Sequence, residues 1–185
     1  MERAKEAVSD EQNLDRNQVS LIVKDFMSAL EDISLTTVNT TLVADTKSAT
    51  IIKTSSISGD AVGTISFNGD YRGQLILGFS KEAICELTTN MLSSAKKYSN
   101  HRNPDVQGAL GEITNQVAGR ARLKVNKRTG WEASNGVPSI IVGDRIGWDI
   151  CSKKSVVIHL PYKTSTNNIL YMEIALYHHP SVEKR

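Results

Sequence analysis

A helical segment of this chain, residues 108–119, contains more glycine than a helix normally tolerates. Its apolar residues, together with one just before it, recur at the spacing of a single buried helical stripe: Val106, Leu110, Ile113 and Val117. A glycine inside a helix costs about 1 kcal/mol relative to alanine, so Gly108, Gly111 and Gly119 need a reason. We therefore predict a helix with one buried face and an opposite face that carries few side chains.

The side of this helix opposite the apolar stripe carries two polar side chains one turn apart. At about 100° per residue, Glu112 and Asn115 fall on that side together with Gly108 and Gly119. A Glu and an Asn at this spacing usually mark a solvated surface, but glycines on the same face would weaken such a helix for no gain. Close packing inside the domain is an alternative explanation for Gly111, at one edge of this face. The pattern favours a face that another macromolecule approaches closely.

The elements expected around this helix are typical of a mixed fold. Helices are predicted over residues 18–33, 81–92 and 104–125, the last two after the N-cap residues Ser80 and Asn103. One or two strands are predicted within residues 36–58, including 49–53. Further strands are predicted at residues 61–67, 74–79, 139–142 with 148–151, 156–160 and 169–177, and turns at 68–70 and 134–136. Because the strands are grouped and do not alternate with helices, we predict an α+β fold: a largely antiparallel sheet with three helices packed on it.

The 185-residue chain is long enough for one domain with a sizeable core. Residues 1–17 are polar and charged without a clear period, so we predict a disordered lead-in there. The domain is expected over residues 18–179, and residues 180–185 form a short tail.

The composition gives no sign of a nucleic-acid or membrane partner. The net charge is +2, and the basic pairs at 96–97, 127–128 and 153–154 are scattered without interleaved aromatic residues. No apolar run approaches the roughly 20 residues that span a bilayer, and residues 1–6 lack the hydrophobic region of a signal peptide. Cys85 and Cys151 lie far apart in apolar surroundings, as expected of two buried reduced thiols in a cytoplasmic protein.

The sequence carries no motif for nucleotide, metal or nucleophilic chemistry. It has no Walker A sequence, no dinucleotide fingerprint and no Gly-x-Ser-x-Gly elbow. Its histidines share no metal-ligand spacing: His101, His159, His178 and His179. We therefore expect no metal or cofactor of the chain's own, which leaves Glu112 and Asn115 as the candidate site.

At these two residues the chain resembles the CheX branch of the CheC/CheX/FliY family of chemotaxis response-regulator phosphatases. That family carries the pattern Glu-x-x-Asn on a glycine-containing helix. Residues 137–143, Val-Pro-Ser-Ile-Ile-Val-Gly, are similar to the proline-led strand that follows the family's active helix. Residues 71–80 are similar to the strand that leads into its second helix. The resemblance covers about residues 18–178 in the order of elements, and both flanking blocks make the short motif fairly specific.

The resemblance also implies an assembly. CheC-type members carry two Glu-x-x-Asn helices, whereas CheX-type members carry one and are homodimers. This chain has one, so the resemblance implies a CheX-like phosphatase domain whose sheet pairs across the two subunits of a homodimer. The long polar N-terminus and the basic linker at residues 96–102 depart from the family and leave the choice of partner open.

The activity implied by the resemblance is hydrolysis of the aspartyl phosphate of a phosphorylated CheY-like response regulator. In this hypothesis Asn115 orients the attacking water, and Glu112 pairs with the lysine that the regulator places beside its phosphate. The Mg²⁺ ion of this chemistry is expected on the regulator. The face that meets the partner would be formed by Gly108, Gly111, Gln116 and Gly119.

Two other interpretations fit the same residues. One is a non-catalytic module that docks a phosphorylated response regulator, like the flagellar-switch relatives that share the fold without the motif. The other is an unrelated α+β dimerisation domain whose glycines serve internal packing. The presence of both Glu112 and Asn115 favours the enzyme.

Overall fold

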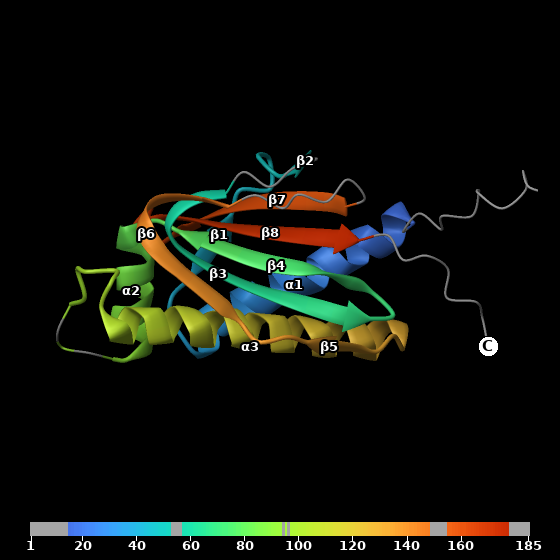
Figure 1. The fold of residues 1–185 in the computed structure, drawn as a ribbon, viewed down its shortest axis with the longest axis horizontal. Helices are drawn as coiled ribbons and strands as arrows, with labels where there is room; N and C mark the ends of the chain where they lie inside the picture. Colours follow the sequence, from blue (N-terminus) through green and yellow to red (C-terminus); the bar gives the residue numbers. More distant parts are fainter. Residues whose placement is uncertain (1–14, 53–56, 94, 96, 149–154, 178–185) are drawn as a thin grey trace, which may run out of the picture.

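The computed structural model describes residues 15–52, 57–93, 95, 97–148 and 155–177 of the chain. These residues form three helices and eight strands (Figure 1). In chain order the elements are α1 (Arg16–Thr36), β1 (Leu42–Ala44), β2 (Thr50–Ile52), β3 (Ile57–Gly69), β4 (Arg72–Phe79), α2 (Lys81–Met91), α3 (Pro104–Thr129), β5 (Ala133–Asn135), β6 (Ser139–Trp148), β7 (Ser155–Thr164) and β8 (Ile169–Tyr177).

The strands make one antiparallel sheet. Its order is β1-β7-β8-β4-β3-β5, with β2 also paired to β7 and β6 also paired to β3. In Figure 1, α1 passes behind the strands and α3 runs along the lower edge of the sheet. The larger hydrophobic cluster joins residues of all three helices to one face of the sheet. The predicted α+β fold, with an antiparallel sheet and three helices, is therefore confirmed.

Each helix begins at a side chain that accepts a hydrogen bond from the first turn. Asp15 caps α1 and forms a capping box with Gln18, so residues 16 and 17 belong to the helix and not to the predicted lead-in. Ser80 and Asn103 cap α2 and α3, as the sequence predicted. These local caps fix the starting points of the helices, including the helix that carries the candidate site.

The helices α1 and α3 lie antiparallel along a shared seam. Asp25 of α1 accepts two hydrogen bonds from the guanidinium of Arg128 near the end of α3. One turn back along α3, Lys124 Nζ lies 2.9 Å from Asp32 Oδ2. The carboxyl-terminal half of α3 is therefore tied to α1 by ion pairs.

Two predicted turns are wrong in position. β3 continues to Gly69, so the hairpin turn follows this residue and does not span 68–70. Of residues 134–136, the first two belong to β5, which pairs with the end of β3. A Cβ at Gly69 would lie only 2.2 Å from the backbone oxygen of Glu132, so the glycine lets the chain entering β5 approach. The turn-like composition of these residues is overridden by strand pairing.

The strand β6 is longer than predicted. The sequence predicted strand residues at 139–142 and 148–151, whereas the structure has one strand through residue 148; residues 149–154, with Cys151, lie outside the described part. Asp60 of β3 accepts a hydrogen bond from the Arg145 amide at 3.1 Å, where Arg145 has a φ of 53°. The register between β3 and β6 shifts between Gly59 and Ala61, beside Asp60. This irregularity lets β6 stay paired with β3 on both sides of its polar residues 143–145.

Candidate functional site

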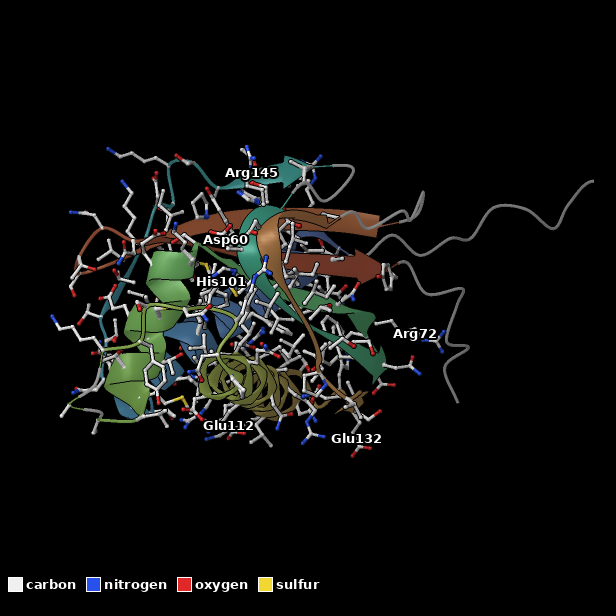
Figure 2. The ribbon with its side chains drawn as sticks, turned by 60° about the vertical axis from the view of Figure 1, so that its left-hand side comes forward. Asp60, Arg72, His101, Glu112, Glu132 and Arg145 are labelled. Carbon is white, nitrogen blue, oxygen red and sulfur yellow. The ribbon has the colours of Figure 1, made fainter. Side chains whose placement is uncertain are left out.

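The outer face of α3 carries the two residues that the sequence singled out. Glu112 and Asn115 are both exposed, and Figure 2 shows Glu112 on the side of α3 that points away from the sheet. The stripe predicted to be buried is at most 2% exposed: Val106, Leu110, Ile113 and Val117. Because Glu112 and Asn115 are separated by one helical turn, their carboxylate and carboxamide are presented to the same side of the molecule.

The glycines of this face leave open space above the helix. Within the described residues, a Cβ added to Gly108 or Gly119 would meet nothing within 4 Å beyond α3 itself. A Cβ at Gly111 would lie 3.7 Å from Ile140 Cγ1, which is an ordinary van der Waals contact. Internal packing therefore requires none of these three glycines. Gly108 and Gly119 leave a face on which another backbone can come close to α3, whereas Gly111 lies beside Ile140 of the same chain.

The carboxylate of Glu112 is oriented by a short chain of hydrogen bonds. Gln116 Nε2 donates to Glu112 Oε1 at 2.6 Å, and Thr37 Oγ1 donates to Gln116 Oε1 at 2.8 Å. Thr37 is the C-cap residue of α1, so this chain links the end of α1 to the site on α3. Gln116 was predicted on the partner-binding face. It is half-buried, and its hydrogen bond holds the Glu112 side chain in place.

The carboxamide of Asn115 is free by contrast. Within the part of the chain that the structure describes, it has no intramolecular hydrogen-bond partner. An exposed carboxamide has two donors and two acceptor lone pairs available to water or to a bound molecule. The site thus pairs an oriented carboxylate with an unengaged carboxamide.

Sequence reasoning missed the residue that orients the site from a distance. Thr37 and Gln116 are 79 positions apart, and no local pattern links them. The only available signal was that Gln116 follows Glu112 by four residues on a helix, a spacing at which side chains meet.

The described residues contain no group of three His, Cys, Asp or Glu side chains that could hold a metal ion. His101 Nε2 lies 2.9 Å from the backbone oxygen of Gly143, and His159 pairs with Glu173, while His178 and His179 lie outside the described part. Cys85 is a free, buried cysteine, as predicted, and burial raises the pKa of its thiol. No helix in the described ranges is long and apolar enough to cross a membrane.

Residues 61–161 match the family model of the chemotaxis phosphatase CheX. The matched range spans more than half of the chain and includes the whole of α3, with Glu112 and Asn115. The chain belongs to the CheX family. A comparison with curated proteins finds no match.

Solved structures of similar proteins share this fold. A CheX from Desulfovibrio desulfuricans is 24% identical, with 84% of this chain and 98% of that chain covered and a TM-score of 0.73. A CheC-like superfamily protein from Shewanella sp. PV-4 is 24% identical, with 84% and 96% covered and a TM-score of 0.75. The CheX of a CheX–CheY–BeF₃–Mg²⁺ complex from Borrelia burgdorferi is 15% identical, with 85% and 98% covered and a TM-score of 0.63.

Proposed function

We propose that this member of the CheX family accelerates hydrolysis of the aspartyl phosphate of a CheY-like response regulator. The observation that carries the proposal is the exposed, unengaged Asn115 beside an oriented Glu112 on a helix face without side chains at Gly108 and Gly119. The relative from Borrelia burgdorferi, solved as a complex with CheY, BeF₃ and Mg²⁺, supports the choice of partner.

Asn115 would act on the attacking water. Hydrolysis of an acyl phosphate depends on positioning and electrostatics, because the protein contributes little covalent chemistry to phosphoryl transfer. A carboxamide can accept a hydrogen bond from the water and hold it in line without bringing negative charge toward the phosphoryl group. A glutamine has the comparable role in GTPases.

Glu112 would set the register of α3 in the partner's site. A carboxylate held by Gln116 is ready to form a charge-assisted hydrogen bond with a lysine beside the regulator's phosphate. The side-chain entropy of Glu112 is already reduced before binding, so less is lost when the pair forms. Neither residue acts as a general base in this mechanism, and the Mg²⁺ ion belongs to the regulator. The homodimer implied by the resemblance stays a prediction.

The test is phosphate release from an acyl-phosphorylated, Mg²⁺-loaded CheY-type regulator. We expect the wild-type chain to accelerate release. With Asn115→Ala the accelerated rate should fall about 100-fold or more, while folding and binding stay intact. Gln107→Ala is the matched control, because Gln107 is an exposed carboxamide of the same helix that bonds the backbone oxygen of Arg102. Binding without acceleration by the wild type would make the chain a docking module, and equal activity of Asn115→Ala would remove the assigned role.

A further inference from the structure

Three exposed apolar side chains, each from a different part of the chain, border the face of Glu112 and Asn115. They are Leu35 near the end of α1 at 57% exposure, Leu123 of α3 at 61%, and Val137 between β5 and β6 at 86%. Single exposed apolar residues are common on soluble proteins and need no explanation. Three that lie along the borders of the helix face with this polar site form a surface that favours a protein partner.

The position of Val137 follows from contacts on either side of it. Gly111 of α3 lies beside Ile140 of β6, and Arg122 Nη1 lies 3.5 Å from the backbone oxygen of Ala133 in β5. The connection between β5 and β6 must therefore run along α3 between these two points. Gly111, Asn115 and Arg122 share one side of the helix, being spaced i, i+4 and i+11. Val137 thus lies on the Asn115 side of the site.

The two leucines border the site from other directions. Leu35 follows Asp32 by three residues, so it lies on the side of α1 where Asp32 meets Arg120 and Lys124 of α3. Because the two helices are antiparallel, Leu35 lies one turn nearer than Asp32 to the Glu112 end of α3. Leu123 follows Glu112 by 11 residues, which is a rotation of only about 20° and a rise of about 16 Å along α3. It continues the outer face toward the carboxyl end of the helix. We name Leu35, Leu123 and Val137 the apolar rim.

The charge of α3 is divided along its length. Its acidic residues are Asp105 and Glu112, and all its basic residues follow Gly119: Arg120, Arg122, Lys124, Lys127 and Arg128. Lys124 and Arg128 are engaged by Asp32 and Asp25. Lys127 is exposed and has no ion-pair partner among the described residues, and Arg120 Nη1 is 3.9 Å from Asp32. Positive charge therefore lies beside the apolar rim at the Leu123 end.

We propose that the apolar rim packs against apolar side chains around the aspartyl phosphate of the response regulator, while Arg120 and Lys127 attract the acidic surface beside it. The inference rests on the proposed function and names how the partner is recognised. A phosphoryl group and the carboxylates that bind its Mg²⁺ make the partner's site anionic, which suits the unpaired Lys127 and the loosely paired Arg120. Apolar contacts around a polar centre exclude bulk water and strengthen the electrostatic interactions inside it.

The test separates affinity from the rate of hydrolysis. Titration calorimetry measures the Kd for a CheY-type regulator loaded with beryllium fluoride and Mg²⁺, and single-turnover phosphate release measures the rate at saturation. We expect Val137→Asp, Leu123→Asp and Leu35→Asp each to raise Kd about tenfold or more, with a rate at saturation close to that of the wild type. Val137→Leu should keep the wild-type Kd. Ile51→Asp is the control, because Ile51 is 75% exposed on β2, at the opposite edge of the sheet from β5.

The outcomes distinguish this inference from the proposed function. If the three rim variants bind as tightly as Ile51→Asp while the wild type accelerates hydrolysis, the apolar rim is wrong and the phosphatase stands. If the rim variants lose affinity but the wild type does not accelerate hydrolysis, the apolar rim stands and the phosphatase is wrong. If the wild type does not bind the loaded regulator, both are wrong.

Discussion

Glu86 on α2 and Glu112 on α3 are helical carboxylates with very different surroundings. Glu86 Oε2 accepts hydrogen bonds at 2.6 to 2.8 Å from the connection between β7 and β8, donated by Thr164, Thr166 and Asn168. Glu112 accepts a hydrogen bond from Gln116, on its own helix. An ionised carboxylate has about four lone-pair sites. Glu86 therefore uses much of its capacity to join α2 to the sheet, whereas Glu112 keeps most of its capacity for another molecule.

The comparison shows that helical position and charge do not distinguish a carboxylate engaged within the fold from one left available to a partner. Both residues lie two positions after a buried apolar residue of their helix, Ile84 or Leu110, and both carry the same group. What differs is the number of donors that distant segments bring to each. Hydrogen-bonding capacity left unused on an exposed, preorganised side chain is the feature that points to a partner.

The largest expected effect tests Glu112, the member of this pair to which we assign a role in function. Glu112→Ala should lower the rate of phosphate release from a phosphorylated CheY-type regulator by about 100-fold, because the contact that positions α3 is lost. The free energy of unfolding should change by less than about 0.5 kcal/mol, since Glu112 is exposed. The rate and the free energy of unfolding are measured on the same preparation. A large loss of stability in Glu112→Ala would contradict the claim that Glu112, unlike Glu86, has no structural role.

Glu86→Ala should have the reverse profile. Its side chain accepts several hydrogen bonds that join two elements, so we expect a loss of about 2 kcal/mol in the free energy of unfolding, measured by urea denaturation. The rate of phosphate release at saturating regulator should be unchanged. Glu82→Ala is the control on the same helix, because Glu82 is exposed and lies 3.6 Å from Lys81 Nζ in a surface ion pair. An equal loss in both variants would contradict the structural role of Glu86.

A smaller effect is expected from alanine at the two open glycines of α3, which tests whether the bare face serves partner binding and not stability. Gly108→Ala and Gly119→Ala should each raise the free energy of unfolding by about 0.5–1 kcal/mol, since alanine favours the helix and meets no neighbour. The same variants should bind the regulator more weakly. Gly69→Ala is the opposing case and should destabilise, because its Cβ would lie 2.2 Å from Glu132 O. Unchanged affinity in both stabilised variants would show that the bare face does not serve close approach.

The smallest effect concerns Asp60, a carboxylate that, like Glu86, is hydrogen-bonded within the fold. Hydrogen bonds from the Arg145 amide and then the Lys81 amide hold the pKa of Asp60 below its ordinary 3.8, against an opposing effect of burial. Because the folded-state pKa is depressed, the stabilisation is present above the ordinary value and is lost as the pH falls through the folded-state value. Stability of Asp60→Asn should therefore fall less steeply than that of the wild type below about pH 4. Urea titrations from pH 6 to 3 measure this slope, and identical slopes would contradict it.

Much of the fold was predictable wherever the signal was local. The caps Ser80 and Asn103 and the apolar stripe of α3 lie within a few residues of the structure they specify. β5 was predicted as a turn because residues 134–136 have turn composition, and its pairing partner, β3, is more than 60 positions earlier in the chain. The extent of β6 was missed for the same reason: its polar middle is held by a hydrogen bond to Asp60 on the neighbouring strand β3, which is distant in the sequence.

Local sequence was enough to place Glu112 and Asn115 on one exposed face, because helical geometry relates residues three positions apart. Their surroundings depended on how separate segments pack. Thr37 reaches Gln116 from another helix, and Ile140 of β6 comes beside Gly111. Side-chain spacing along a helix is a property of the backbone, whereas the donors and apolar surfaces around a site arise only when the sheet and helices are assembled.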